Sequence, residues 1–198
     1  MIDNTELIKQ LLAFNQDYYK FACIMRPKDN SVALNREANH EVCVHQWLIQ
    51  SLDEYTHYLP DMLTYASLFK CRIYMTVDSK SKIKTLMQIR SKAQELLDQT
   101  MLGQTQLSCG SIQKIVNSAT SLKECSGKTK RWLFDVDTKD QHVLSTVINA
   151  CKDSYICTIE TVNGYHVIAR KDFNARVLAF SMKNVELKEN AMTLVAKY

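Results

Sequence analysis

The segment Arg131–Asp137 constrains the fold more than any other part of the chain. Its aromatic and aliphatic residues predict a buried strand. Residues i and i+2 of a strand share a face, so we expect Asp135 and Asp137 to project together while Val136 turns into the core. Two adjacent carboxylates repel each other and are costly to bury without a cation, which predicts a Mg²⁺ or Mn²⁺ site. A simpler alternative is that Asp137 caps the next helix and Asp135 faces solvent.

Composition indicates a folded protein that acts in the cytoplasm. The 198 residues are 46% hydrophobic and include only 4 glycines and 2 prolines, which argues against long linkers. No apolar run approaches the roughly 20 residues of a membrane span, and the N-terminus is too polar for a secretory signal. The 7 cysteines form no CxxC pair, so we expect free thiols in a reducing cytoplasm.

The formal net charge of +4 is unevenly distributed along the chain. Residues 1–102 hold 12 basic and 12 acidic residues, whereas residues 103–198 hold 13 and 9. The excess therefore lies in the half that carries the aspartate pair. Such a bias fits a polyanionic ligand, either a nucleotide or a nucleic acid.

Residues 1–102 are predicted to form an N-terminal α/β module. The expected elements are a helix over 4–19, strands over 20–26 and 41–49, a helix over 51–69, a strand over 71–77 and a helix ending near 99. Arg72 and Tyr74 share one face of their strand, where both could contact a substrate, with packing alone as the alternative role of Tyr74.

Residues 103–130 are predicted to form a connector made of a helix over 111–121 and a basic loop. Within the loop, Gly127-Lys128-Thr129 resembles part of a phosphate-binding P-loop. That motif needs a glycine five places before Gly127, where Leu122 stands, and a helix after it, where a strand is expected. We therefore interpret Lys128 and Lys130 as part of a basic loop that contacts phosphates.

Residues 131–198 are predicted to form a βαββαβ core. We expect a strand over 131–136, a helix over 137–151, strands over 154–160 and 165–170 joined at Asn163-Gly164, and a short helix over 173–180. Residues 185–187 and 192–196 are expected to form one final strand, which could be broken at 188–190. This order is the split βαβ of ferredoxin-like and RNA-recognition-like folds. The whole chain is then α+β, with the α/β module packed on this core. Because the first and third strands are neighbours, Asp135 and Asp137 should lie close to His166.

Further side chains complete the predicted site. His166 can donate to a phosphate oxygen, and Arg170 returns to the same strand face four residues later. A third acidic ligand is expected from Glu186 on the last strand, with Asp172 as the second choice. The acids would hold a divalent ion against a nucleoside triphosphate during phosphoryl transfer.

These residues resemble the motifs of the archaeo-eukaryotic primase superfamily, which includes primase-polymerases. Phe134-Asp135-Val136-Asp137 resembles its first motif, Gly164-Tyr165-His166 its second, and Val185-Glu186 loosely its third, where aspartate is usual. The resemblance implies that Asp135 and Asp137 are metal ligands and that His166 contacts the incoming nucleotide. It implies a small member like those of phages and mobile elements, with a DNA or RNA template and replication proteins as candidate partners.

The sequence leaves three classes of function open. The first is a metal-dependent nucleotidyltransferase. The second is a non-catalytic module on the same fold that binds nucleic acid or protein, although only Tyr165 could stack a base on the open sheet face. The third is a metal-dependent phosphodiesterase or nuclease, in which the same acids activate water.

Overall fold

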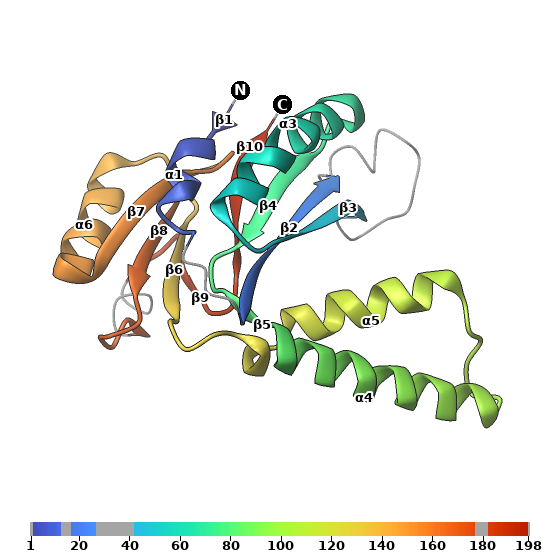
Figure 1. The fold of residues 1–198 in the computed structure, drawn as a ribbon. Coiled ribbons are helices and arrows are strands. Elements are labelled where there is room, and N and C mark those ends of the chain that lie inside the picture. The colour runs from blue at the N-terminus through green and yellow to red at the C-terminus, as the bar shows by residue number, and fades with distance from the viewer. Residues whose placement is uncertain (1, 13–16, 27–41, 177–181, 198) are drawn as a thin grey trace.

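The protein is a mixed α+β fold built on two antiparallel sheets, seen here in a computed structural model (Figure 1). The structure describes residues 2–12, 17–26, 42–176 and 182–197. Within these residues, no helix is both long and apolar enough to cross a membrane. None of the six cysteines whose side chains are described forms a disulfide, as the sequence predicts.

The first sheet contains strands from both ends of the chain. Its main path runs β1-β10-β4-β2-β3, and β5 pairs with β2. The strands are β1 (Ile2–Asp3), β2 (Tyr18–Arg26), β3 (Val42–Ile49), β4 (Arg72–Thr76), β5 (Lys80–Ser81) and β10 (Met192–Lys197). Helix α3 (Leu52–Phe69) covers one face, and its buried residues Tyr55, Met62 and Ala66 join the core there.

The second sheet has the order β7-β8-β6-β9. Its strands are β6 (Arg131–Val136), β7 (Tyr155–Glu160), β8 (Tyr165–Arg170) and β9 (Val185–Lys188). Helix α6 (Gln141–Cys151) covers the outer face and is followed by a short 3₁₀ turn, η2 (Lys152–Ser154). The predicted adjacency of the first and third strands is confirmed, because β6 lies beside β8.

Strand β6 is buried on both faces, because it packs between α6 and the first sheet. Trp132, Phe134 and Val136 pack with α6 in one core cluster. Leu133, on the other face, joins a second cluster that includes Ile24 of the first sheet. Since residues alternate along a strand, Asp135 must point toward the first sheet.

The N-terminal segment differs from the prediction. The helix expected over 4–19 is only α1 (Thr5–Lys9), and Tyr18 already begins β2; residues 13–16 lie outside the described residues. Ile8 and Leu11 are buried as an amphipathic helix requires, but the aromatic residues Tyr19 and Phe21 favour a strand.

The final strand also differs from the prediction, because residues 185–196 form two strands in different sheets. β9 pairs with β6, whereas β10 pairs with β4 and β1. Asn190, between them, has a left-handed backbone with φ of 56°, which asparagine tolerates better than most residues. The short helix expected over 173–180 falls largely outside the described residues, since 177–181 are among those left out.

An antiparallel helical arm projects from the first sheet (Figure 1). It consists of α4 (Lys82–Met101) and α5 (Cys109–Ser121), with the 3₁₀ turn η1 (Lys123–Cys125) leading back to β6. Ser81 caps α4 by accepting a hydrogen bond from the backbone of Lys84. The helix predicted over 111–121 is thus confirmed and begins two residues earlier.

Three buried basic side chains surround the end of β4. Lys20 and Arg131 both donate to the carbonyl of Val77. Asp78 accepts a hydrogen bond from the backbone of Arg131, at 2.9 Å. Lys80, only 1% exposed, donates to Asn190 and lies 3.4 Å from Ser126 Oγ. Burial lowers the pKa of Lys80 from 10.5 to about 8, although Asp78 opposes the shift.

The low pKa of Lys80 predicts a pH dependence of stability. Between pH 8 and 10.5 the unfolded chain holds more protons at this site than the folded protein, so the free energy of unfolding rises with pH in that window. The free energy of unfolding is measured by urea denaturation at about pH 7.5 and about pH 9.5. In the wild type, deprotonation of Lys80 should add about 2 kcal/mol to it between these pH values, and Lys80→Met should lose this increase. The exposed Lys84→Met is the control and should retain the gain. An equal pH dependence in Lys80→Met and the wild type would contradict the burial argument.

Candidate active site

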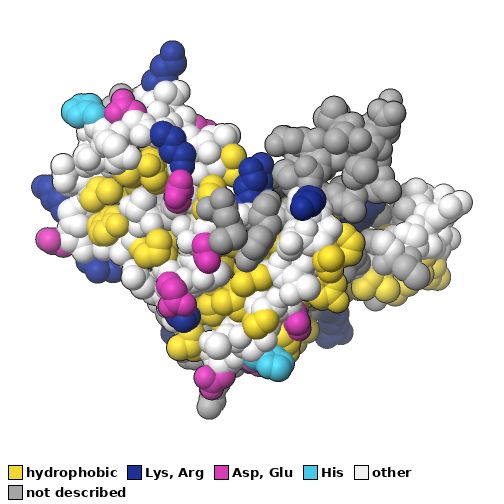
Figure 2. All heavy atoms as spheres, turned by 90° about the horizontal axis from the view of Figure 1, so that it is seen from above, with side chains coloured by type: hydrophobic (Ala, Val, Ile, Leu, Met, Phe, Trp, Pro, Cys, Tyr) yellow, Lys and Arg dark blue, Asp and Glu magenta, His cyan; other side chains and the backbone are white. Residues whose placement is uncertain are grey.

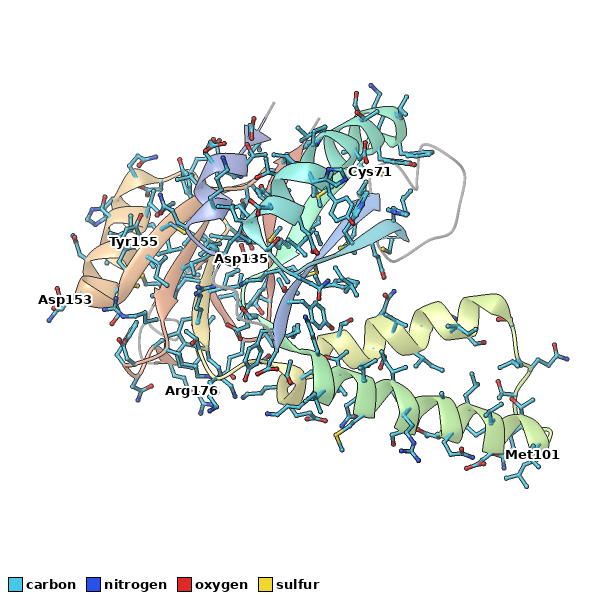
Figure 3. All side chains as sticks on the ribbon, in the orientation of Figure 1. Cys71, Met101, Asp135, Asp153, Tyr155 and Arg176 are labelled. Carbon is cyan, nitrogen blue, oxygen red and sulfur yellow. The ribbon has the colours of Figure 1, made fainter. Side chains whose placement is uncertain are left out.

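Asp135 lies near the end of β6, an inner strand of the second sheet, between a histidine and a glutamate on the two neighbouring strands. Its register partners are His166 on β8 and Glu186 on β9. Cross-strand partners project their side chains to the same face, so all three project toward the first sheet. Figure 3 shows Asp135 near the centre of the molecule, between the two sheets.

Both carboxylate oxygens of Asp135 are engaged. His166 Nε2 lies 3.4 Å from Oδ1, and the Lys188 ammonium pairs with Oδ2. His166 Nδ1 lies 2.9 Å from Thr193 Oγ1 on β10, so its ring bridges the two sheets. Lys188 also lies 3.3 Å from Glu186 Oε2.

Electrostatics keep Asp135 ionised despite its burial. The side chain is 12% exposed, and burial by itself would raise the pKa of this carboxyl. The hydrogen bonds and charges of His166 and Lys188 outweigh burial and lower the pKa to about 2. Partial burial lowers the pKa of Lys188, but the carboxylates of Asp135 and Glu186 outweigh it and raise this pKa.

Asp137 follows β6 directly and is exposed. Its backbone N–H donates to the carbonyl of Asn184, at 2.9 Å, which extends the pairing of β6 with the segment before β9. The alternative that Asp137 caps the next helix and Asp135 faces solvent is wrong. Asp140 is the cap of α6, through its side chain and the backbone of His142, and Asp135 is buried.

A cavity of about 390 Å³ opens over this face. The second sheet contributes four charged or titratable side chains, and the first sheet contributes apolar and basic ones. Its lining residues are Met25, Arg72, Tyr74, Met192 and Leu194 from the first sheet, Asp135, Asp137, His166 and Lys188 from the second, and Thr161, Val162 and Asn163 from the β7–β8 turn. Arg72 and Tyr74 therefore face the same space as Asp135, as their shared strand face predicts.

Four predicted site residues do not line this cavity. One is Glu186, which lies beside Asp135 in register but has a side chain that is 68% exposed. The others are Arg170, Lys128 and Lys130. Arg170 lies at the far end of β8, four residues or about 13 Å along the strand from His166. It is half-exposed and pairs with Asp172 at 3.1 Å. Lys128 and Lys130 precede the start of β6, whereas Asp135 lies near its end. Arg170 shares a strand face with His166, but it lies outside the site because β8 extends beyond the cavity.

Lys188 and Thr193 belong to the site but were missed by sequence reasoning. Lys188 stands two residues after Glu186, so strand alternation would have placed it on the same face. Thr193 could not have been found in this way, because β10 pairs in the first sheet rather than with β6.

The acidic side chains of the site are of the chemical type that hard divalent cations prefer, because they offer carboxylate oxygens. As the side chains stand, no group of three or more His, Cys, Asp or Glu residues among those described is arranged to hold a metal ion. Mg²⁺, however, is commonly held by one or two carboxylates together with the phosphates of a substrate. The Lys188 ammonium, which contacts both Asp135 and Glu186, marks a position where these acids already accept a cation.

Charged side chains on the face seen in Figure 2 are mixed in sign. Basic groups, acidic groups and apolar patches alternate there instead of forming one basic surface. Recognition of a polyanion on this face would therefore depend on individual side chains rather than on a broad positive field.

Gly164 holds the β7–β8 turn against the end of β6. The predicted hairpin is confirmed, because Glu160 pairs with Tyr165. The need for glycine arises from close approach: a Cβ at Gly164 would lie 1.8 Å from the carbonyl oxygen of Val136 and 2.8 Å from the backbone nitrogen of Thr138. The turn could not accept a side chain without moving away from Asp137.

Replacing Gly164 should therefore damage the site through the backbone. We expect Gly164→Ala to destabilise the protein by about 2 kcal/mol or more, because backbone atoms must shift. The control is Gly110→Ala in α5, where the nearest atom to a new Cβ is Ser108 Oγ at 3.7 Å, so stability should be retained. Thermal denaturation measures both, and a Gly164→Ala protein as stable as the wild type would contradict the close approach.

Comparison with known proteins identifies no relative for this chain. No family model matches it, and searches of curated proteins and of solved structures likewise found no match. The function is therefore argued from the residues of the site themselves.

Proposed function

We propose that this chain is a metal-dependent nucleotidyltransferase of the primase or primase-polymerase type. The observation that carries the proposal is the arrangement at Asp135. Its carboxylate is flanked in register by His166 and Glu186 and faces Arg72 and Tyr74 across a cavity of about 390 Å³. Ligand pockets for small molecules have volumes of this order.

The order of the elements supports the same proposal. In the second sheet the chain runs strand, helix, strand, strand and, after residues 177–181, a fourth strand, with the spatial order β7-β8-β6-β9. A ferredoxin-like or RNA-recognition-like core would have this strand order, which supports the proposal. The resemblance to archaeo-eukaryotic primases implies such a core beside an N-terminal module, with the catalytic acids on its central strand.

Each site residue has a proposed role. Asp135 and Asp137, with Glu186 as a third acid, would hold Mg²⁺ or Mn²⁺. Such an ion would neutralise charge on the phosphates and stabilise the charge that develops in phosphoryl transfer. The low pKa of Asp135 keeps this ligand deprotonated near neutral pH, as metal binding requires. His166, buried and fixed by Thr193, would contact the nucleotide, and Arg72 would attract the triphosphate from the opposite wall.

The packing of the second sheet argues against a simple RNA-recognition module. Such modules stack bases on aromatic side chains of an open sheet face. Here the face opposite α6 carries Leu133, Ile159 and Ile168, which are buried in the core shared with the first sheet. Base stacking on that surface would require the two sheets to separate.

The proposal predicts metal-dependent nucleotide binding at the aspartates. In calorimetric titrations, wild type should bind a nucleoside triphosphate in Mn²⁺ but much more weakly in EDTA. Asp135→Asn/Asp137→Asn, which keeps side-chain size but removes both charges, should weaken binding in Mn²⁺ by about 100-fold. Asp153→Ala/Asp172→Ala removes two carboxylates near the far end of the second sheet and should bind like the wild type. Metal-independent binding, or equal binding by the Asn variant, would contradict the proposal.

A further inference from the structure

Lys188 is the side chain at the site whose contacts are easiest to change. His166 and Lys188 each engage one oxygen of Asp135. The His166 side chain is 11% exposed and is also held by Thr193, whereas the Lys188 side chain is 40% exposed and ends a flexible stem. Breaking the contact between Lys188 and Asp135 should therefore cost less free energy than breaking the contact between His166 and Asp135.

The position of the Lys188 ammonium is one that suits a metal ion. It contacts Asp135 and lies 3.3 Å from Glu186, and Asp137 lines the same cavity. A single positive charge thus pairs with two carboxylates, those of Asp135 and Glu186. A divalent cation bound to the same oxygens would compete with the ammonium by direct repulsion and for the same lone pairs.

We infer that Lys188 is a tethered counter-ion, which pairs with Asp135 when no substrate is bound and turns to the nucleotide phosphates when the site is loaded. The inference rests on the proposed function, because it assigns a two-state role to one residue of that site. It also explains how Asp135 is kept charged inside the protein before any ligand arrives. Within the cavity, the ammonium needs only a change of its own side-chain torsions to exchange one anionic partner for another.

The inference predicts opposite effects of Lys188→Met on two ligands. Mn²⁺ alone should bind about tenfold more tightly to the variant, because a competing positive charge is gone. At saturating Mn²⁺, a nucleoside triphosphate should bind about tenfold more weakly, because a phosphate contact is lost. A residue that only supports the fold would weaken both. Calorimetry measures both affinities, and Lys188→Gln provides a second neutral variant with a polar end.

Lys171→Met is the matched control. Lys171 follows β8, pairs with Glu189 at 2.9 Å and packs over the Trp132 ring, away from Asp135. It should leave both affinities unchanged. If Lys188→Met and Lys188→Gln bind Mn²⁺ no more tightly than a wild type that does bind it, the inference is wrong and the metal site stands. If the wild type and both Lys188 variants fail to bind Mn²⁺ at millimolar concentrations, the proposed function fails and the inference with it.

Discussion

The packing of β6 between two cores is the constraint on which the rest of the molecule depends. One face of the strand is covered by α6 and the other by the first sheet. The strand must therefore be apolar on both faces along its middle, and its polar residues, Arg131 and Asp135, lie near its two ends. Asp135 lies where the shared core gives way to a cavity.

Asp135 is charged and buried, and burial of a charge destabilises a folded protein. Burial of a carboxylate is costly unless it is paired and hydrogen-bonded. The protein meets this cost with one fixed partner, His166, and one half-exposed partner, Lys188. Under the proposed function, the half-exposed partner is the one that a bound cation would displace.

The positions of site residues could be predicted from the sequence where they depend on the local pattern of residues along the chain. Strand alternation at 131–137, the Asn163-Gly164 turn and the βαββ order together place Asp135 beside His166, and the register agrees. The same reasoning failed where the structure depends on pairing between strands that are far apart in the sequence. Nothing local indicates that β10 leaves β9 for the first sheet, so the hydrogen bond between Thr193 and His166 could not be foreseen.

Arg170 and the N-terminal segment show two further limits of pattern reasoning. A shared strand face puts Arg170 on the correct side of the sheet but says nothing about distance along it. Ile8 and Leu11 are buried at helical spacing, yet the helix predicted over 4–19 cannot reach Tyr19, because Tyr18 and the residues after it pair in the first sheet. In both cases tertiary packing overrides a local signal.

The most direct test of the central claim is the location of bound Mn²⁺. Crystals of the wild-type protein with Mn²⁺ and a non-hydrolysable nucleoside triphosphate should give an anomalous scattering peak at the manganese edge. We predict a peak beside the carboxylates of Asp135 and Asp137, with the phosphates on the side of Lys188 and Arg72. A peak at another place in the molecule, or nucleotide bound outside the cavity between the sheets, would contradict it.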